Sequence, residues 1–220
     1  MRKNITQSGR KRADNRRYID NDWFPFGIPP NVTISNGVYI DTSYGFAGFY
    51  SKKRNALVID EASGCYDRTT IITGVDGEVR VGKFTILNGT TLIANKSVTI
   101  GDHCMLSWGS ILTDSWLDNG LPERQMALKL AAASPNRPMP FCGEPKAVVL
   151  GDNVWIGFGT VIMPGVTIGQ GAVIGSKAVI TDDVPPYAVV VGSPPRIIRY
   201  LDPNDTSEAK AAAFERHLST

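Results

Sequence analysis

Residues 150–180 read LGDNVWIGFGTVIMPGVTIGQGAVIGSKAVI, and a large aliphatic residue returns in this stretch at every sixth position. These positions are Leu150, Ile156, Ile162, Ile168, Ile174 and Ile180. The residue two places before each of them is small or β-branched. A period of six fits neither the 3.6-residue period of an amphipathic helix nor the two-residue alternation of a simple strand. The stretch therefore predicts a chain that turns after every six residues.

Three such turns would close one coil with three flat faces. The large aliphatic residue would fill the triangular interior, and a glycine such as Gly151 or Gly157 would accept the backbone of the corner without Cβ strain. Stacked coils would pair as parallel strands and bury one continuous core. The expected fold class is therefore all-β, a parallel β-helix. The spacing alone does not give the direction in which the coil winds.

The same period continues upstream of residue 150. It is seen at Val81, Leu87 and Ile93, then, after a slip of one residue, at Ile100, Leu106 and Leu112, with a looser echo at Ile34, Ile40 and Phe46. We therefore expect a β-helix domain over 31–200, preceded by a basic N-terminal extension over 1–30.

Two segments break the period. Residues 113–147 form an excursion with no sixfold repeat, and residues 122–133 inside it have helical composition with Pro122 at an allowed first-turn position. An excursion of this length in a compact domain is usually functional. After the last coil, Asp205 and Glu208 offer an N-cap pair for a C-terminal helix within 201–220.

The composition is that of an ordinary soluble domain. The 220 residues are 42% hydrophobic and 20% charged, and the net charge of +2 gives no general attraction to nucleic acid or to a membrane. Seven of the 23 basic side chains lie in the first 17 residues, which we interpret as a solvated arm. No apolar run reaches the roughly 18 residues that span a bilayer, and the start lacks the apolar stretch of a signal peptide. We expect a cytoplasmic protein.

The cysteines and histidines argue against a metal site. The three cysteines have no paired spacing, and His103 and His217 are the only imidazoles. A zinc hydratase of the γ-carbonic anhydrase type shares the β-helix but needs three histidines from adjacent coils and subunits. We therefore expect no metal and exclude this class.

The motifs IGDHCMLSWG at 100–109, VWIG at 154–157 and GSPPRIIR at 192–199 together resemble the hexapeptide-repeat acetyltransferases of the maltose, galactoside and xenobiotic branch. This resemblance implies a left-handed β-helix, a homotrimer with active sites between subunits, and acetyl-CoA as the acyl donor. The implied acceptor is a small molecule, such as a sugar, a polysaccharide precursor or a xenobiotic alcohol.

The family's catalytic histidine, which takes the proton of the acceptor, is missing. It is expected sixteen or seventeen residues after the glycine of IGD, and counting from Gly101 gives Leu117 or Asp118. Three hypotheses remain open. His103 is the base; or Asp114 or Asp118 is the base; or the protein binds acetyl-CoA as a scaffold without catalysis.

The resemblance also implies the residues of the donor site. Gly157 and Gly159 would lie beside the thioester and the pantetheine arm, Ser176 and Ala178 would line the groove further along, and Arg196 and Arg199 would lie near the nucleotide phosphates. Asp182 replaces a phosphate-facing lysine of the family, and two interpretations of Lys177 remain open: it compensates for that loss, or both residues are solvated charges at the rim. Trp108 and Trp155 are expected on outer faces, near a subunit interface or an acceptor pocket.

Overall fold

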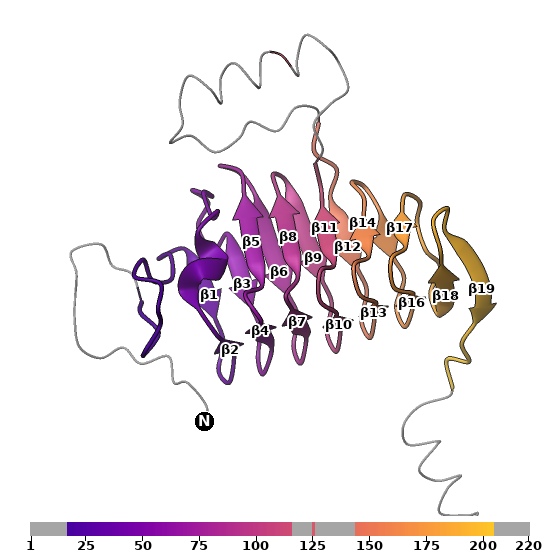
Figure 1. The fold of residues 1–220 in the computed structure, drawn as a ribbon, viewed down its shortest axis with the longest axis horizontal. Helices are drawn as coiled ribbons and strands as arrows, with labels where there is room; N and C mark the ends of the chain where they lie inside the picture. The colour runs from indigo at the N-terminus through magenta and orange to yellow at the C-terminus, as the bar shows by residue number, and fades with distance from the viewer. Residues whose placement is uncertain (1–16, 116–124, 126–143, 205–220) are drawn as a thin grey trace, which may run out of the picture.

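The computed structural model describes residues 17–115 and 144–204, together with Gln125. Within these residues the chain is a parallel β-solenoid whose coils stack side by side along one axis (Figure 1). The predicted all-β parallel fold is confirmed. The left-handed winding stays a prediction. The expected helices over 122–133 and 206–218 lie outside the described residues, apart from Gln125.

Three sheets form the faces of the solenoid, with all strands parallel except the antiparallel pair of β18 and β19, and coils 2 to 6 each contribute one strand to each face. The first face consists of β1 (Val32–Ile34), β3 (Leu57–Ile59), β6 (Glu78–Val81), β9 (Ser97–Ile100), β12 (Val148–Leu150) and β15 (Thr167–Ile168). The second face consists of β2 (Tyr39–Ile40), β4 (Gly64–Tyr66), β7 (Ile86–Asn88), β10 (Met105–Leu106), β13 (Trp155–Ile156), β16 (Val173–Ile174), β18 (Ala188–Val191) and β19 (Arg196–Tyr200). The third face consists of β5 (Thr70–Thr73), β8 (Thr91–Ala94), β11 (Ile111–Thr113), β14 (Val161–Ile162) and β17 (Val179–Ile180).

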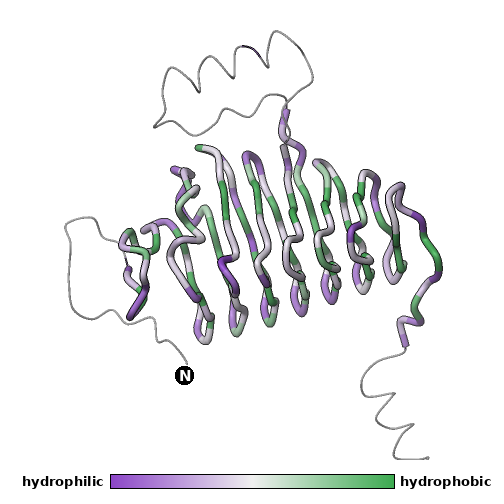
Figure 2. Tube along the Cα trace, viewed as in Figure 1, coloured by the Kyte–Doolittle hydropathy of each residue, from purple (hydrophilic) through white to green (hydrophobic). Residues whose placement is uncertain are grey.

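The coils are numbered here 1 to 6, from the one that holds β1 to the one that holds β15. The 3₁₀ helix η1 (Ser43–Phe46) lies next to β5 and takes the place of a third-face strand in coil 1. We call the turn from the first to the second face the first corner, the next turn the second corner, and the turn back to the first face the third corner. The excursion leaves the solenoid at the third corner, between β11 and β12 (Figure 1). Figure 2 shows hydrophobic residues recurring along the coils, with hydrophilic residues concentrated at the turns.

The sixfold aliphatic residues fill the interior, as the spacing predicts. On the second face, one row of inward side chains pairs in register from coil to coil: Ile40, Cys65, Leu87, Leu106, Ile156 and Ile174. All six are buried. Because each coil stacks its aliphatic residue on that of its neighbours, the core is continuous along the solenoid.

The predicted position of Ile93 in this pattern is wrong. Leu92 and Ala94 are the buried residues of β8, whereas Ile93 is only partly buried, and Leu92 pairs with Ile71 on one side and Leu112 on the other. The corner before β8 is one residue shorter than the corner between Leu106 and Leu112, which moves the inward position forward by one.

The glycines of the repeat act differently from the prediction. Gly151 and Gly157 are not among the residues with positive φ. A Cβ on Gly157 would instead lie 2.6 Å from the main-chain nitrogen of Ser176, so the glycine is needed because the next coil packs so closely. The positive φ at the corners falls on other residues, including Phe84 and His103 at φ 53° and 57°.

Part of the predicted N-terminal extension packs against coil 1. Ile19 and Ile28 are buried, and the carboxylate of Asp22 accepts hydrogen bonds from the main-chain N–H and the hydroxyl of Ser43 in η1. This segment covers the open end of the core. No helix among the described residues has the length and apolar character needed to cross a bilayer.

Candidate functional site

The second corner brings five predicted site residues together over three successive coils. They are Trp108 in coil 4, Gly157 and Gly159 in coil 5, and Ser176 and Lys177 in coil 6. Main-chain hydrogen bonds fix the register, since Gly159 N–H donates to the carbonyl of Trp108 at 3.0 Å and Lys177 N–H donates to that of Phe158 at 2.8 Å. The hydroxyl of Ser176 accepts from Phe158 N–H at 3.1 Å.

Two glycines shape this corner, of which Gly157 is buried against the next coil and Gly159 is partly exposed. Gly157 has no room for a side chain, and Gly159 has φ +60°, a conformation that costs an L residue roughly 1–2 kcal/mol. A Cβ on Gly159 would lie 2.8 Å from the Nζ of Lys177. The Lys177 side chain therefore lies across Gly159 and brings an ammonium group to the backbone of this corner.

An aromatic surface borders this backbone. Trp108 and Phe158 are 47% and 49% exposed, their ring centroids are 5.5 Å apart, and their planes lie within 10° of parallel. The indole Nε1 of Trp108 donates a hydrogen bond to Oδ2 of Asp67 at 2.6 Å. Sequence reasoning did not include Phe158 or Asp67 in the site.

Trp155 lies on the outer side of the second face, where it pairs with Met105 of coil 4 and Val173 of coil 6. It is 48% exposed, and Met105 and Ile86 next to it in register are also exposed. The expected outward placement of both tryptophans is what the structure shows. The second face thus carries an apolar strip along its outer side.

One predicted groove residue is misplaced. Ala178 is fully buried inside the coil, where its N–H donates to the carbonyl of Gly175 and its own carbonyl accepts from Val161 N–H. Its methyl group belongs to the core because Ala178 occupies the small position two residues before Ile180. It therefore offers no side chain to a ligand in the groove.

The two arginines lie on β19, which pairs antiparallel with β18 at the end of the second face. Arg196 is opposite Val191, and a Cβ on Gly175 would lie 2.8 Å from Cγ1 of Val191, so Arg196 is on the second-corner side of the strand. Arg199 is opposite Val189, two residues back toward the first corner. Both arginines are exposed.

His103 lies at the first corner and not at the second. Its imidazole stacks on the ring of Phe84, with centroids 5.1 Å apart and planes within 12° of parallel. Strand β10 crosses the second face between His103 and Trp108, and five residues of extended chain span roughly 16 Å. A single chain therefore does not bring His103 to the glycine backbone.

Asp114 lies at the third corner and is fully buried. Its carboxylate accepts hydrogen bonds from the main-chain N–H groups of Asn95 and Lys96, at 2.9 and 2.7 Å, and from the hydroxyl of Ser115 at 2.6 Å. These contacts make Asp114 a cap for the corner of the preceding coil. Asp118 lies outside the described residues.

The described thiols are poor nucleophiles. Burial raises the pKa of Cys65 to about 12, helped by the negative charge of Asp41, and burial also raises the pKa of Cys104. Thiolates are therefore scarce at neutral pH at both positions. Among residues 17–115 and 144–204, no three His, Cys, Asp or Glu side chains are grouped so that they could hold a metal ion.

Comparison with known proteins bears directly on the second corner. The family described as bacterial transferase hexapeptide (six repeats) matches residues 147–182. The chloramphenicol acetyltransferase of Agrobacterium fabrum is 57% identical over 51 residues, which is 23% of this chain and 24% of that protein. A putative acetyltransferase of Staphylococcus aureus is 45% identical over 60 residues, 27% of this chain and 30% of that protein. The chain thus matches less than a third of the length of these relatives.

Solved structures share the fold over a larger part of the chain. A hexapeptide-repeat containing acetyltransferase from Vibrio cholerae has 29% identity and a TM-score of 0.52, over 64% of this chain and 72% of that one. Its structure complexed with acetyl coenzyme A has 27% identity and a TM-score of 0.53, over 64% of this chain and 69% of that one. An N-acyltransferase from Bacillus cereus has a TM-score of 0.59 over 84% of this chain and 90% of that one, but its 18% identity supports the fold alone. The chain is thus similar to the hexapeptide-repeat family over residues 147–182, and the relatives named here are acetyltransferases.

Proposed function

We propose that this protein is an acetyltransferase that moves the acetyl group of acetyl-CoA to a hydroxyl or amine of a small acceptor. One observation carries the proposal. The second corner brings Gly157 and Gly159 together with Trp108 and Lys177, and three of these residues, Gly157, Gly159 and Lys177, lie within the stretch that matches the transferase family. The related Vibrio cholerae acetyltransferase binds acetyl coenzyme A, which supports the choice of donor.

The donor fits along the second corner. The pantetheine arm is an extended chain with amide groups, and a corner where Gly159 carries no side chain of its own lets such a chain approach closely once the Lys177 side chain moves aside. Lys177 supplies an ammonium group beside it, and Arg196 and Arg199 lie further along the same face, on β19. Guanidinium groups form charge-assisted hydrogen bonds with phosphate oxygens, so the nucleotide end of acetyl-CoA is assigned to this end of the solenoid.

The chemistry needs a base that removes the proton of the acceptor as its oxygen or nitrogen attacks the thioester carbon. The carbon–sulfur bond then breaks and CoA leaves as a thiol, while main-chain N–H groups stabilise the negative oxygen formed on the way. A base near the working pH is worth roughly 10²–10⁴-fold in rate.

We assign the base to His103 of a neighbouring copy in a homotrimer. His103, the glycine backbone and Asp114 occupy three different corners, so the His103 imidazole reaches the second corner only from a second copy. The exposed apolar strip of Ile86, Met105 and Trp155 supplies a surface for such an assembly, and a three-faced solenoid closes with cyclic symmetry. Asp118 is the alternative base. Asp114 is disfavoured because its carboxylate already accepts hydrogen bonds from two main-chain N–H groups and from the hydroxyl of Ser115.

A second candidate function is acetyl-CoA binding without catalysis. The separation of His103 from the second corner within one chain favours it. The two functions differ in turnover. A scaffold would bind acetyl-CoA but release no CoA with any acceptor.

Calorimetry and an acceptor panel test the proposal. Acetyl-CoA is expected to bind and to raise the melting temperature, since a ligand that binds only the native state adds RT ln(1 + [L]/Kd) to its stability. An unrelated nucleotide serves as the control. CoA release is then followed with sugars and alcohols, and sedimentation gives the oligomeric state. No heat and no thermal shift at millimolar acetyl-CoA would overturn the acetyltransferase, and binding without turnover across the panel would favour the scaffold.

A further inference from the structure

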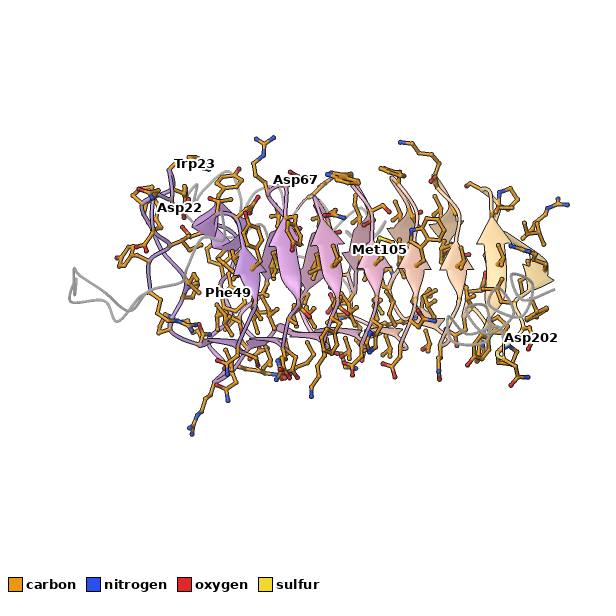
Figure 3. All side chains as sticks on the ribbon, turned by 90° about the horizontal axis from the view of Figure 1, so that it is seen from below. Asp22, Trp23, Phe49, Asp67, Met105 and Asp202 are labelled. Carbon is orange, nitrogen blue, oxygen red and sulfur yellow. The ribbon has the colours of Figure 1, made fainter. Side chains whose placement is uncertain are left out.

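We propose that Asp67 is a positioning residue that holds the Trp108 indole at the second corner, and through it sets the affinity of that corner for acetyl-CoA. The inference rests on the proposed function, because it concerns the same site. Asp67 stands outside every motif of the repeat, and Figure 3 shows it at the outer edge of the solenoid, on the same side as Trp23.

The contact spans two coils. Asp67 follows β4 in coil 2 and Trp108 follows β10 in coil 4, so about 10 Å of stacked backbone separates their strands at the usual spacing of about 4.8 Å. The indole Nε1 nevertheless donates to Oδ2 of Asp67 at 2.6 Å. The indole therefore leans back over the corner of coil 3.

Coil 3 permits this because its corner residue is Gly89. A Cβ on Gly89 would lie 3.1 Å from Cδ1 of Trp108 and 3.3 Å from the carbonyl oxygen of Asp67. Gly89 also has φ +49°, which any L side chain would adopt only with strain. The intervening coil thus leaves open the path along which the indole reaches the carboxylate.

The other coil neighbour of Trp108 limits the indole from the opposite direction. Phe158 of coil 5 lies with its ring centroid 5.5 Å away and nearly parallel, and the carbonyl of Trp108 accepts from Gly159 N–H. The carboxylate on one side and the ring on the other hold a side chain that is half exposed. Without the charge-assisted hydrogen bond, an exposed indole would sample several rotamers.

A fixed indole matters because it borders the backbone of Gly157 and Gly159. An indole that is already fixed in the free protein loses no further freedom when acetyl-CoA binds. Each side chain that must be immobilised on binding costs roughly 0.5–1.5 kcal/mol. Asp67 does not touch this backbone in any contact that the structure gives it. Its effect therefore passes through Trp108.

The test compares Asp67→Ala, Asp67→Asn, Trp108→Phe and the double variant Asp67→Ala with Trp108→Phe. The control is Asp76→Ala, which changes an exposed aspartate at the third corner of coil 2, the coil that also holds Asp67. Two quantities are measured in the full-length protein. One is the indole ¹⁵N–¹H resonance of Trp108, identified by its absence in Trp108→Phe. The other is the dissociation constant of acetyl-CoA by calorimetry.

We expect Asp67→Ala to shift the Trp108 indole resonance. We also expect it to raise the dissociation constant of acetyl-CoA by up to about tenfold, which corresponds to the cost of immobilising one side chain on binding. Asp67→Asn keeps an acceptor oxygen, so we expect its indole resonance and its affinity for acetyl-CoA to lie between those of Asp67→Ala and wild type. The double variant should bind no more weakly than Trp108→Phe, because the two residues act as one unit. Asp76→Ala should change neither quantity.

Three outcomes would overturn the inference alone, provided that wild type binds acetyl-CoA. They are an unshifted Trp108 resonance in Asp67→Ala, a shifted resonance with unchanged affinity, and additive losses in the double variant. Failure of wild type itself to bind acetyl-CoA would overturn the proposed function, and with it the role of Asp67 in donor binding.

Discussion

The carboxylate of Asp114 accepts a hydrogen bond from the main-chain N–H of Lys96 at 2.7 Å, joining coil 4 to the corner of coil 3. The same carboxylate accepts from Asn95 N–H. We predict that Asp114→Asn lowers the free energy of unfolding by about 2–3 kcal/mol, because buried N–H groups that lose a charged acceptor keep their full desolvation penalty. Chemical denaturation measures this. A variant that keeps its stability but loses acetyl transfer would instead identify Asp114 as the base.

Gly159 gives a test of donor binding at the second corner. We predict that Gly159→Ala weakens acetyl-CoA binding at least tenfold, since the new methyl group would displace Lys177 and cover the backbone. Gly165→Ala is the matched control, because Gly165 has φ +88° at the third corner, where a Cβ would meet Lys146. Both variants should lose comparable stability, while only the first should lose affinity. Equal affinity in the two variants would place the donor elsewhere.

The two arginines of β19 should contribute unequally. Arg196 is on the second-corner side of the strand and Arg199 is two pairing positions away, opposite Val189. We therefore predict that Arg196→Ala raises the dissociation constant of acetyl-CoA by about tenfold, as the loss of one charge-assisted contact would. Arg199→Ala should raise it by less. Acetyl-pantetheine lacks the nucleotide phosphates, and its affinity should be the same in both variants and wild type. An equal loss for acetyl-pantetheine would mean that Arg196 acts on another part of the donor.

The buried thiol of Cys65 should resist alkylation. Its pKa is raised to about 12, so the native protein at pH 8 holds almost no thiolate at this position. The same shift makes stability depend on pH. The unfolded thiol ionises near pH 9 and the folded one near 12, so the stabilising effect of burial is complete below pH 9 and is lost as pH rises toward 12. Mass spectrometry of peptides after iodoacetamide treatment, with and without denaturant, measures the reactivity. Rapid modification of Cys65 in the native protein would contradict the burial.

The sequence predicted the repeating core well and the local corners poorly. Leu150 and Ile156 to Ile180 keep a strict period, and a strict period leaves one way to stack the coils. The period fails at Ile93 because the corner before β8 is one residue shorter than the others. The sixfold spacing gives no means of predicting this shorter corner. Ala178 was assigned to the groove by resemblance, although its place two residues before Ile180 marks it as core.

The contact of Asp67 with Trp108 was beyond sequence reasoning for a different physical reason. The two residues are 41 positions apart, and they meet only because the register of three coils aligns them over Gly89. A glycine at a corner is too common in this repeat to signal such a contact by itself. His103 was identified from its chemistry, but its distance from the glycine backbone depends on the width of the second face.

The assignment of His103 to a neighbouring subunit predicts complementation between two inactive variants. His103→Ala removes the base and keeps the glycine backbone, whereas Gly159→Val keeps the base and blocks the backbone. In trimers formed from equal amounts of the two variants, a site is intact when the base comes from a Gly159→Val subunit and the backbone from a His103→Ala subunit. Random assembly with cyclic symmetry makes about a quarter of all sites intact, which corresponds to about one of the three sites in each trimer that contains both variants. Co-expression with two different affinity tags isolates the mixed trimers, and CoA release measures their activity. A mixture of His103→Ala with His103→Gln should stay inactive and serves as the control. If trimers that carry both tags show no activity while wild-type trimers prepared in the same way do, His103 does not act across the subunit boundary, and the base must be sought at Asp118.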